Sequence, residues 1–475
     1  MEDFRLVRAE VRRFQRATEE VATDLKSQLA SDVRVKILTH TDADGIAAGN
    51  ILARCLNYYD IPFHITFTPP LSPSKLEELA KEDYDLFFFL DQGTGQISGI
   101  EEYLLNAGHK VVILDHHPGR FPDRSGLFHL NPHSHDLNGA KDVSASGVVY
   151  SVVKELNERF TPLSEIALIG ALGDRQEFFS GFTGVNQEIC KQSIDEEILK
   201  VKQGLKLVPR TSKISETLLR SIKPYLSSIS GDEEAAQKLV ENTGLDPNKV
   251  LAELDLESEE KLKDAILNQV KVEPTGDFKH ALWGTIYTST VEQTAGPKNA
   301  HEYVAMLDAC EKLGRPELGF ATLFGDEDAR DEALEMLREY QEKMVKVLDW
   351  FASKRKNFKA NPQMRYIDTG NEVESKMIGE ALSLAIESSL INPDLPIFGL
   401  ADFGEDGLKV SARATPDYAM RGPNIGNILG KVSRELGGSG GGHDTAAAAR
   451  LPRERKDEFI TKVSQSLEEA VAGNE

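Results

Sequence analysis

The sequence predicts an α/β protein with a parallel-sheet domain, a helical insertion in that domain, and a smaller α/β domain across a cleft. Two observations support this fold class. Short apolar runs alternate with segments of helical character up to about residue 190, which is typical of parallel strands joined by helices. The chain also has 475 residues, more than one hydrophobic core usually holds, so two domains and an insertion are expected.

Three buried parallel strands are predicted in the first domain. The runs Val33–Leu38, Tyr84–Leu90 and Lys110–Leu114 are short, rich in β-branched or aromatic residues, and flanked by polar segments. Continuous apolar runs of this length indicate strands that are covered on both faces. Before them, apolar residues recur at helical spacing between residues 2 and 30, which predicts an amphipathic helix packed against this domain.

An acidic motif follows each of these strands, and a fourth motif follows another apolar segment. The motifs are His40-Thr-Asp42-Ala-Asp44-Gly45, Leu90-Asp91-Gln92-Gly93, Asp115-His116-His117 and Gly173-Asp174-Arg175. Side chains at the carboxyl ends of neighbouring parallel strands converge on one crevice. Asp42 and Asp44 are expected to point the same way because they lie two apart in an extended segment, and Gly45 is expected to permit the turn into the next helix.

Four carboxylates in one buried pocket would repel one another unless cations neutralised them. A single Asp after a strand is most often a turn former or a helix cap, but four in order predict a two-metal site for phosphoester hydrolysis. Carboxylate and imidazole ligands suit Mn²⁺, with Mg²⁺, Co²⁺ or Zn²⁺ as substitutes. The histidine-dense stretch at residues 128–135 lacks firm ligand spacing, so a separate zinc site is not expected there.

The four motifs in this order, with the tripeptide Asp115-His116-His117, resemble the DHH phosphoesterase superfamily. The run Gly437-Gly-Ser-Gly-Gly-Gly-His443-Asp-Thr-Ala-Ala-Ala448 resembles the glycine-rich motif of its companion DHHA1 domain. Length, motif order and the long middle segment most resemble the archaeal RecJ-like exonucleases of the GINS-associated nuclease type. The resemblance implies a DHH catalytic domain over 1–195, a helical insertion over 196–280, completion of the first domain with a connector helix over 281–357, and a DHHA1 substrate-binding domain over 358–475.

The resemblance also implies roles for individual residues. His40, Asp42 and Asp91 would hold one of two Mn²⁺ ions, and Asp44, Asp91, His116 and Asp174 would hold the other, with Mg²⁺ as an alternative ion. Asp91 would then bridge both ions, Asp115 would orient a histidine, and His117 would face the scissile phosphate. Substrate would be bound by Arg175, Arg413, Gly440, Gly441, Gly442 and His443. Pairing with the surrounding carboxylates is the alternative for Arg175.

The insertion and the last domain are predicted from local patterns. Strands are expected to vanish between about residues 200 and 274, with short helices at 232–241 and 258–267, the second beginning at Ser258. The resemblance implies that this insertion docks a partner, the GINS complex, and a purely structural role is the alternative. Later strands are predicted at 364–368, 395–400 and 408–413, and the alanine run after the glycines is expected to form a helix.

Composition bounds the partners. The formal net charge of −22, from 55 basic and 77 acidic residues, argues against a protein that coats nucleic acid through a uniformly basic surface. Nine Lys or Arg against four acids lie between Lys409 and Lys456, which predicts a local basic patch, with scattered solvated charges as the alternative. The three cysteines lie far apart and suggest no disulfide framework. Without an apolar leader or a membrane-length run, a soluble cytoplasmic protein is expected.

The favoured function, which the resemblance implies, is a manganese-dependent exonuclease that acts on single-stranded DNA or RNA in DNA replication or repair. A small-substrate phosphodiesterase, acting on short oligonucleotides or cyclic dinucleotides, would share all the motifs. An inorganic pyrophosphatase of the same superfamily is less expected because its second domain lacks the glycine-rich histidine motif. A replication scaffold that binds GINS is the alternative from a different class.

Overall fold

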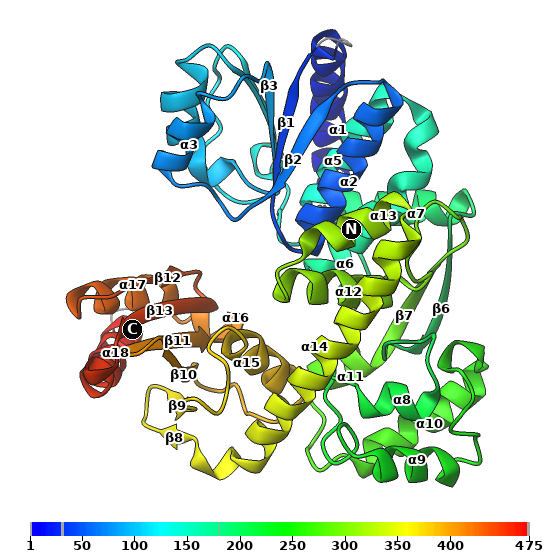
Figure 1. Cartoon of the computed structure of the whole chain (residues 1–475), viewed down its shortest axis with the longest axis vertical. Coiled ribbons are helices and arrows are strands. Elements are labelled where there is room, and N and C mark those ends of the chain that lie inside the picture. The colour runs from blue at the N-terminus through cyan, green and yellow to red at the C-terminus, as the bar shows by residue number, and fades with distance from the viewer. Residues whose placement is uncertain (1, 30–32, 180, 473–475) are drawn as a thin grey trace. The chain divides into compact units, whose positions relative to one another are not determined.

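The computed structural model describes residues 2–29, 33–179 and 181–472, and the chain divides into two compact units (Figure 1). The first unit consists of Met1–Val208 and Gly284–Tyr340, and the second of Pro209–Trp283 and Gln341–Glu475. The division into four parts, with boundaries at residues 195, 280 and 357, remains a proposal. Within the described ranges, no helix has both the length and the apolar character needed to cross a membrane.

A five-stranded sheet forms the centre of the first unit. Its order is β2-β1-β3-β4-β5, and every neighbouring pair is parallel. The strands are β1 (Val35–Thr39), β2 (Phe63–Phe67), β3 (Leu86–Leu90), β4 (Lys110–Leu114) and β5 (Leu127–Leu130). The three predicted strands are confirmed as β1, β3 and β4. This strand order is doubly wound, with the switch point between β1 and β3, where such sheets bind ligands.

Helices cover both faces of this sheet (Figure 1). Phe87, Phe89 and Ile113 face α3 (Pro73–Leu79) and the helical segment 97–105, which includes α4 (Ile97–Gly99). On the other side, α2 (Ala43–Tyr58) and α5 (Ala145–Leu156) pack against the strands. The unit also contains α6 (Ser164–Gly173), α7 (Gly184–Asp195), α12 (Ala300–Lys312) and α13 (Pro316–Phe324). Double coverage explains why the strands read as unbroken apolar runs.

The amphipathic N-terminal helix is confirmed as α1 (Glu2–Gln28). It packs on α5, and its buried face includes Val11, Phe14 and Leu25. The predicted end of this helix at residue 30 lies outside the described residues.

A two-stranded sheet pairs β6 (Leu199–Leu205) with β7 (Trp283–Ser289). The prediction that strands vanish from about residue 200 is therefore wrong for this segment. Most side chains of β6 are exposed, so the strand carries little apolar signal of its own, and its pairing partner lies about eighty residues further along the chain. The long helix expected within residues 281–357 is present as α14 (Glu327–Ser353).

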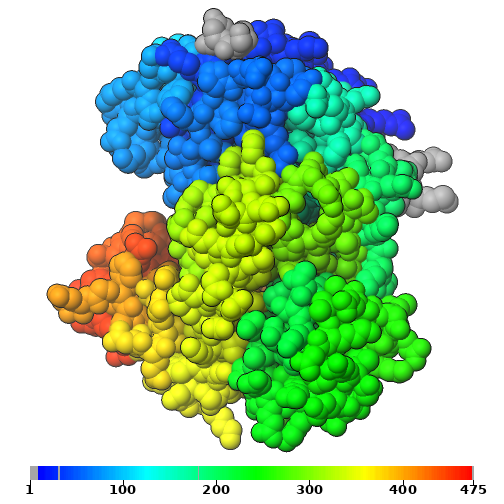
Figure 2. All heavy atoms as spheres, turned by 45° about the vertical axis from the view of Figure 1, so that its right-hand side comes forward, coloured from blue at the N-terminus to red at the C-terminus, as the bar shows by residue number. Residues whose placement is uncertain are grey.

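Between these strands the chain is helical, with α8 (Ile214–Leu219), α9 (Glu233–Asn242), α10 (Leu256–Gln269) and α11 (Gly276–Leu282). Figure 2 shows this segment, in green, as one close-packed lobe. The helix predicted at 232–241 is confirmed, with Asp232 as its N-cap. The predicted start of the next helix at Ser258 is wrong, because the Asp255 carboxylate caps α10 by accepting the Ser258 amide at 2.8 Å.

The end of the chain forms a six-stranded sheet of order β12-β13-β11-β10-β9-β8. Its strands are β8 (Lys359–Ala360), β9 (Arg365–Asp368), β10 (Ile397–Phe403), β11 (Gly407–Arg413), β12 (Ser439–Gly442) and β13 (Ala446–Pro452). The accompanying helices are α15 (Ile378–Glu387), α16 (Pro416–Ala419), α17 (Ile425–Glu435) and α18 (Lys456–Ala472). The three strands predicted in this part are confirmed as β9, β10 and β11.

The helix predicted from the alanine run is wrong, because the run forms β13. This strand pairs with β11 on one side and with the glycine strand β12 on the other. Ala447 and Ala449, two apart, are both buried in the core of this sheet. Cross-strand pairing and burial on alternate residues have overridden the helix preference of alanine.

Candidate active site

The first acidic motif lies at the end of β1, where the chain turns into α2. Asp42 is the N-cap of this helix, and its Oδ1 accepts the Gly45 amide at 3.0 Å. The prediction that Asp42 and Asp44 share an extended segment is wrong, since Asp44 lies in the first turn of α2. A Cβ added at Gly45 would stand 2.5 Å from the His40 carbonyl oxygen, so this glycine, in the first turn of α2, permits the close approach of the helix to the segment that leads into it, as predicted.

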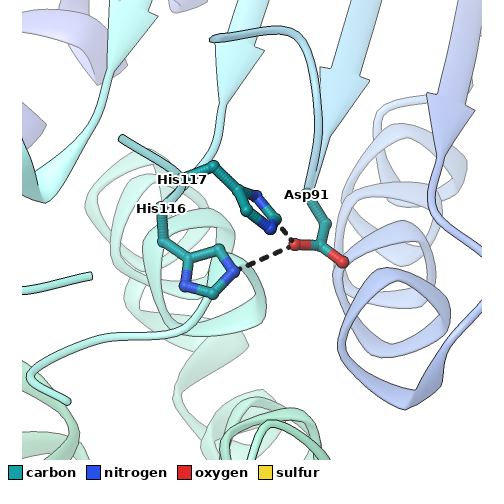
Figure 3. Close-up of side chains that lie close together, drawn as sticks. All are labelled: Asp91, His116 and His117. Carbon is teal, nitrogen blue, oxygen red and sulfur yellow. Dashed lines mark ion pairs between the residues drawn. The ribbon is translucent and has the colours of Figure 1, made fainter. Parts of the chain in front are cut away.

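Asp91 occupies the centre of the group. It follows β3 directly and holds a left-handed backbone with φ of 56°, a conformation that Asp tolerates better than most residues and that is frequent at functional sites. Its Oδ1 lies 3.1 Å from His116 Nε2 and 3.8 Å from His117 Nδ1, and Figure 3 shows both rings turned toward it. Its Oδ2 lies 3.6 Å from His40 Nδ1. The Asp91 carboxylate thus lies between two histidine groups, as a bridging ligand must.

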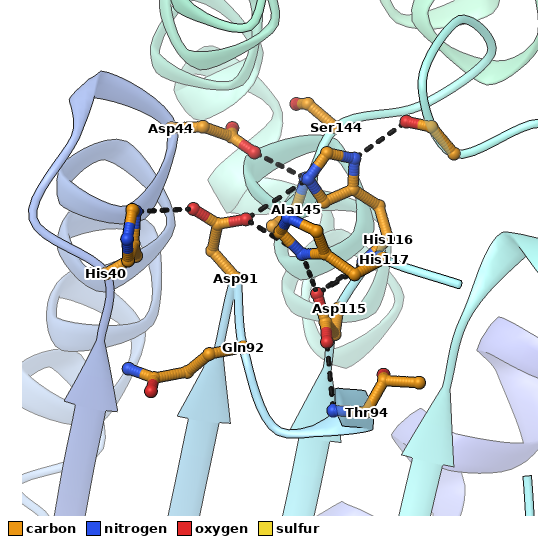
Figure 4. Close-up of polar contacts among 12 residues, drawn as sticks. His40, Asp44, Asp91, Gln92, Thr94, Asp115, His116, His117, Ser144 and Ala145 are labelled. Carbon is orange, nitrogen blue, oxygen red and sulfur yellow. Dashed lines mark hydrogen bonds and ion pairs between the residues drawn. The ribbon is translucent and has the colours of Figure 1, made fainter. Parts of the chain in front are cut away.

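Asp115, at the end of β4, is fully buried and holds His117 in place (Figure 4). Its Oδ1 accepts His117 Nδ1 at 2.8 Å, and its Oδ2 accepts the Thr94 amide at 3.0 Å. Burial opposes ionisation, but the hydrogen bond from His117 outweighs it and lowers the pKa of Asp115 below its ordinary value. Asp115 is therefore a carboxylate that orients a half-exposed imidazole.

Asp44, His116 and Asp174 form the other side of the group. The two oxygens of Asp44 accept the amides of Ala145 at 2.6 Å and Ser146 at 3.0 Å, at the N-terminus of α5. Asp174 caps the C-terminus of α6, and its Oδ2 lies 3.3 Å from His116 Nε2. The four predicted aspartates are thus brought together from the ends of two strands and two helices.

The donor set fits divalent cations. His116 Nδ1 donates to the Gly139 carbonyl at 2.7 Å, so its Nε2 is the nitrogen that faces the oxygens of Asp91 and Asp174. The buried Asp91 Oδ1 has no well-aligned hydrogen-bond donor among the described residues. Without a cation, the arrangement needs a proton on His116 Nε2: burial lowers the pKa of His116, but Asp174 and Asp91 outweigh it and raise that pKa well above its ordinary value. A divalent cation held between the same atoms would take the place of that proton.

Three groups of ligand atoms lie within 4.8 Å of one another in the described part of the chain: His40, Asp42 and Asp91; Asp44, His116 and Asp174; and Asp91, His116 and His117. The first matches the ligand set predicted for one ion, and the second contains three of the four ligands predicted for the other. The third adds His117 as a candidate ligand, a role that the sequence did not predict. None of these groups contains the histidines at 129, 133 or 135.

The charges at the site also favour the binding of divalent cations. Burial raises the pKa of Asp91 well above its ordinary value, and the Asp42 carboxylate raises it further. Burial likewise raises the pKa of Asp174, with Asp44 adding to the effect. Carboxylates whose charged form is disfavoured in this way either take up protons or are neutralised by cations.

Gly139 is packed too tightly to accept a side chain, because an added Cβ would lie 1.9 Å from the His116 carbonyl oxygen. We expect Gly139→Ala to destabilise the protein by about 1–3 kcal/mol, as overpacking does, and to displace the acceptor of His116 Nδ1. Gly95→Ala is the matched control, because a Cβ there meets nothing within 4 Å. Urea denaturation of both variants tests this, and equal midpoints would contradict it.

Sequence reasoning missed several buried polar residues that support the site. Asn131 Nδ2 donates to the His117 carbonyl at 3.0 Å and to Thr94 Oγ1 at 3.1 Å. Asn131 directly follows β5, so a polar residue at a strand end was the available signal. Gln176 lies beside Asp174, and Asn186 donates to Gln176; neither residue had a comparable signal. Burial lowers the pKa of His129 to about 4, which keeps that ring neutral next to Thr94.

The predicted substrate residues other than Arg175 lie in the second unit. Arg413 ends β11, and its guanidinium donates to Ser383 Oγ at 2.7 Å and to the Ala412 carbonyl at 2.9 Å. The glycines at 440–442 end β12, and the exposed His443 begins the turn into β13. Because Arg413 pairs with Ala446 at the start of β13, the arginine and the turn lie at the same end of this sheet. Arg175 is exposed beside Asp174, with a left-handed φ of 57°.

The predicted basic patch is partly neutralised within the second unit. Arg453 and Lys456 pair with Asp368 at 3.0 and 2.9 Å, and Arg455 pairs with Glu458 at 2.6 Å. Burial lowers the pKa of Lys409. The net positive charge expected for this region is therefore reduced by acids that lie outside it in the sequence.

Comparisons with known proteins agree with this geometry. Residues 34–173 match the model of the DHH family, N-terminal domain, and residues 363–469 match that of the DHHA1 domain. Uncharacterized protein MJ0831 of Methanocaldococcus jannaschii is 29% identical over 441 residues, which cover 92% of this chain and 93% of that protein.

Solved structures with a similar fold include exonuclease RecJ bound to manganese, with a TM-score of 0.57, 17% identity, and coverage of 95% of this chain and 94% of that one. CDC45 from Entamoeba histolytica has a TM-score of 0.68, 13% identity, and coverage of 96% and 99%. RecJ of Thermus thermophilus in complex with Mn²⁺ has a TM-score of 0.56 at 17% identity; the match covers 95% of this chain and 55% of that one.

The two matched domains occur in the predicted order, and the acidic residues at the strand ends form one group in the first of them. The parallel sheet in the first unit, the helical content and the sheet of mixed strand direction at the C-terminal end are those of the RecJ fold. The chain therefore belongs to the DHH/DHHA1 superfamily of phosphoesterases and has a RecJ-like fold.

Proposed function

We propose that this protein is a two-metal-dependent exonuclease that hydrolyses phosphodiester bonds of single-stranded DNA, with RNA as an alternative substrate, in DNA replication or repair. The observation that carries the proposal is the convergence of four aspartates, Asp91 among them, and three histidines at the switch point of the sheet. The likeness to exonuclease RecJ bound to manganese supports the choice of reaction and of ion.

Two Mn²⁺ ions, or Mg²⁺ in their place, would be held by His40, Asp42 and Asp91 and by Asp44, Asp91, His116 and Asp174. When bound, these ions supply Lewis-acid polarisation of the phosphate and neutralise its developing charge. The chain supports them by fixing the ligands: His116 is held through its Nδ1 by the Gly139 carbonyl, and Asp42 through its Oδ1 by the Gly45 amide.

His117 is the residue best placed to move a proton. Its Nδ1 donates to the buried Asp115 carboxylate at 2.8 Å, which leaves Nε2 as the basic nitrogen of the neutral ring. The His117 side chain is 47% exposed, so Nε2 is accessible to substrate. We propose that His117, protonated on both nitrogens, donates its Nε2 proton to the leaving oxygen and returns to the neutral ring, while Asp115 holds the ring through Nδ1.

The direct test is digestion of end-labelled oligonucleotides with added Mn²⁺. Single-stranded DNA, single-stranded RNA, duplex DNA and a dinucleotide are compared at equal concentration. Release of mononucleotides from long single strands supports the exonuclease. Hydrolysis of the dinucleotide alone would favour the small-substrate phosphodiesterase and would end the proposal for long strands.

The exposed turn at His443 is proposed to bind substrate phosphate together with Arg413. We expect His443→Ala to raise KM for a single-stranded oligonucleotide about tenfold, with kcat nearly unchanged, because a lost binding contact acts equally on ground and transition states. Lys462→Ala is a matched control in the same unit, since Lys462 pairs with Glu435 at 2.9 Å. Steady-state kinetics measure both, and a change confined to kcat would contradict this role.

A binding role within a replication assembly is the second candidate, and the likeness to CDC45 favours it. In that case the helical segment between β6 and β7 is proposed to dock the GINS complex. Leu256, 51% exposed at the start of α10, is the residue to change. Capture of purified GINS by wild type that is lost in Leu256→Asp would support docking, whereas unchanged capture would clear this helix of the role.

A further inference from the structure

Two buried amide side chains near Asp174 have no assigned role: Gln176, in the loop that follows Asp174, and Asn186, in the first turn of α7. Gln176 is 1% exposed and Asn186 is fully buried. We propose that these two residues form a positioning pair that sets two of the proposed metal ligands, His116 and Asp174, at the same time. The inference rests on the metal site of the proposed function, and it concerns the binding of ions and not the identity of the substrate.

The contacts of Gln176 connect the two ligands. Its Nε2 donates to the Gly139 carbonyl at 2.9 Å and lies 3.4 Å from Asp174 Oδ2. The same Gly139 carbonyl accepts His116 Nδ1 at 2.7 Å. One backbone oxygen therefore accepts a hydrogen bond from the ligand ring and another from Gln176, and the second bond holds that oxygen in the position from which it orients the ring.

The orientation of the Gln176 amide is set by its partner. Asn186 Nδ2 donates to Gln176 Oε1 at 2.7 Å, and this bond requires that the oxygen of Gln176 face Asn186. Its nitrogen then faces Gly139 and Asp174. With the amide reversed, an oxygen would face the Gly139 carbonyl and the Asp174 carboxylate, which would repel both.

Asn186 is itself fixed by the backbone. It lies in the first turn of α7, and its backbone N–H donates to the Asp142 carbonyl at 2.9 Å. Gly184, two residues earlier, has a φ of 56°, and an added Cβ there would lie 2.4 Å from Asp142 Cβ. The start of α7 is thus held against the 139–142 segment, so the positioning pair is attached to a rigid element.

The positioning pair should affect the affinity of the site for metal ions. With Nδ1 of His116 held by Gly139, its Nε2 faces Asp91 at 3.1 Å and Asp174 at 3.3 Å. Loss of the Gln176 donor frees the Gly139 carbonyl to move and leaves Asp174 less constrained. Loss of a residue that hydrogen-bonds to a metal ligand typically weakens metal binding by about 10- to 100-fold.

The test compares Gln176→Met, Asn186→Ala, the double variant and wild type by isothermal titration of the metal-free proteins with MnCl₂. Gln192→Met is the matched control, since Gln192 is a partly buried glutamine on α7 that accepts Lys154 at 3.0 Å. The thermal unfolding of each metal-free protein is recorded beside it, to separate loss of ligand geometry from loss of fold.

We expect Gln176→Met to weaken Mn²⁺ binding by about 10- to 100-fold, while Gln192→Met stays within about twofold of wild type. Asn186→Ala should shift the affinity in the same direction by less, and the double variant should bind no worse than Gln176→Met, because the two residues act as one unit. Hydrolysis by Gln176→Met should recover as the Mn²⁺ concentration is raised.

Mn²⁺ affinity of a folded Gln176→Met protein within about twofold of the Gln192→Met control would overturn the inference, as would additive losses in the double variant. If Gln176→Met does not fold, Asn186→Ala decides: unchanged affinity there counts against the pair. A wild type that binds no Mn²⁺ overturns it as well. A wild type that binds Mn²⁺ but digests no nucleic acid ends the proposed function and leaves the positioning pair intact.

Discussion

Asp91→Asn is expected to lower the rate of single-strand hydrolysis by about 10³-fold or more and, at the same time, to stabilise the metal-free protein. Asp91 is 2% exposed, and burial together with Asp42 raises its pKa well above the ordinary value. An amide in its place has no charge to desolvate and no repulsion from neighbouring carboxylates. The same substitution that lowers the rate of hydrolysis should therefore increase the stability of the metal-free fold. Asn also tolerates the left-handed backbone at this position.

The matched control for this variant is Asp85→Asn, at the opposite end of the same strand. Asp85 is about half exposed and pairs with Arg34 at 3.3 Å, so its loss should leave hydrolysis unchanged. Initial rates at saturating Mn²⁺ and the melting temperature in EDTA are measured for both. Full activity in Asp91→Asn would place the reaction elsewhere, and a lower metal-free melting temperature would contradict the electrostatic argument.

Removal of the ions is the second large effect. EDTA should reduce hydrolysis to background, and excess Mn²⁺ at 100 times its Kd should stabilise the folded state by about 2.7 kcal/mol for each bound ion. The metal-free protein should also respond to pH. Burial lowers the pKa of both His40 and His116, but neighbouring carboxylates, Asp42 for His40 and Asp174 and Asp91 for His116, outweigh it and raise both values.

The sign of the pH effect follows from these shifts. Asp91, Asp174, His40 and His116 all have raised pKa values in the folded chain, so the folded state binds more protons than the unfolded one. Stability of the metal-free protein should therefore increase from about pH 8.5 to about pH 7. The window stops there because buried His129, with its pKa lowered to about 4, works in the opposite direction below about pH 6.5.

With excess Mn²⁺ the trend over the same window should reverse, because protons compete with the ions for the ligands. Melting temperatures in EDTA and in MnCl₂ across this range measure both trends. Asp91→Asn serves as the control, since it lacks one of the titrating groups and should show a smaller slope in EDTA. A metal-free protein that loses stability between pH 8.5 and pH 7 would show that these groups are not under the mutual repulsion described above.

The parallel sheet and the acidic group could be predicted from sequence because local patterns specify both. β1, β3 and β4 are continuous apolar runs, and an Asp follows each at a position where parallel strands must converge. β6 could not be predicted, since its exposed side chains carry no periodic apolar signal and its partner is remote in the chain. The alanine strand β13 failed for a related reason: pairing with β11 and β12 outweighs intrinsic propensity.

Within the site, sequence predicted the acids and histidines but not what holds them. Asp44 was expected to point into the site from extended backbone, whereas it lies in a helix and accepts amides from a second helix 101 residues away. Gln176 and Asn186 escaped prediction because a buried amide is recognised only by its partners, and those partners come from three separate segments. Their roles are set by tertiary contacts that no local pattern encodes.

The two backbone amides that donate to Asp44 would allow metal binding at the site to be observed without substrate. Ala145 and Ser146 donate to the same carboxylate that is proposed to ligate an ion, so occupancy by Mg²⁺, which is diamagnetic, should alter the chemical shifts and deuterium exchange of these two protons. In isotope-labelled protein titrated with Mg²⁺, the signals of these two amides at the start of α5 would therefore report how much of the site is occupied. This measurement needs no nuclease assay.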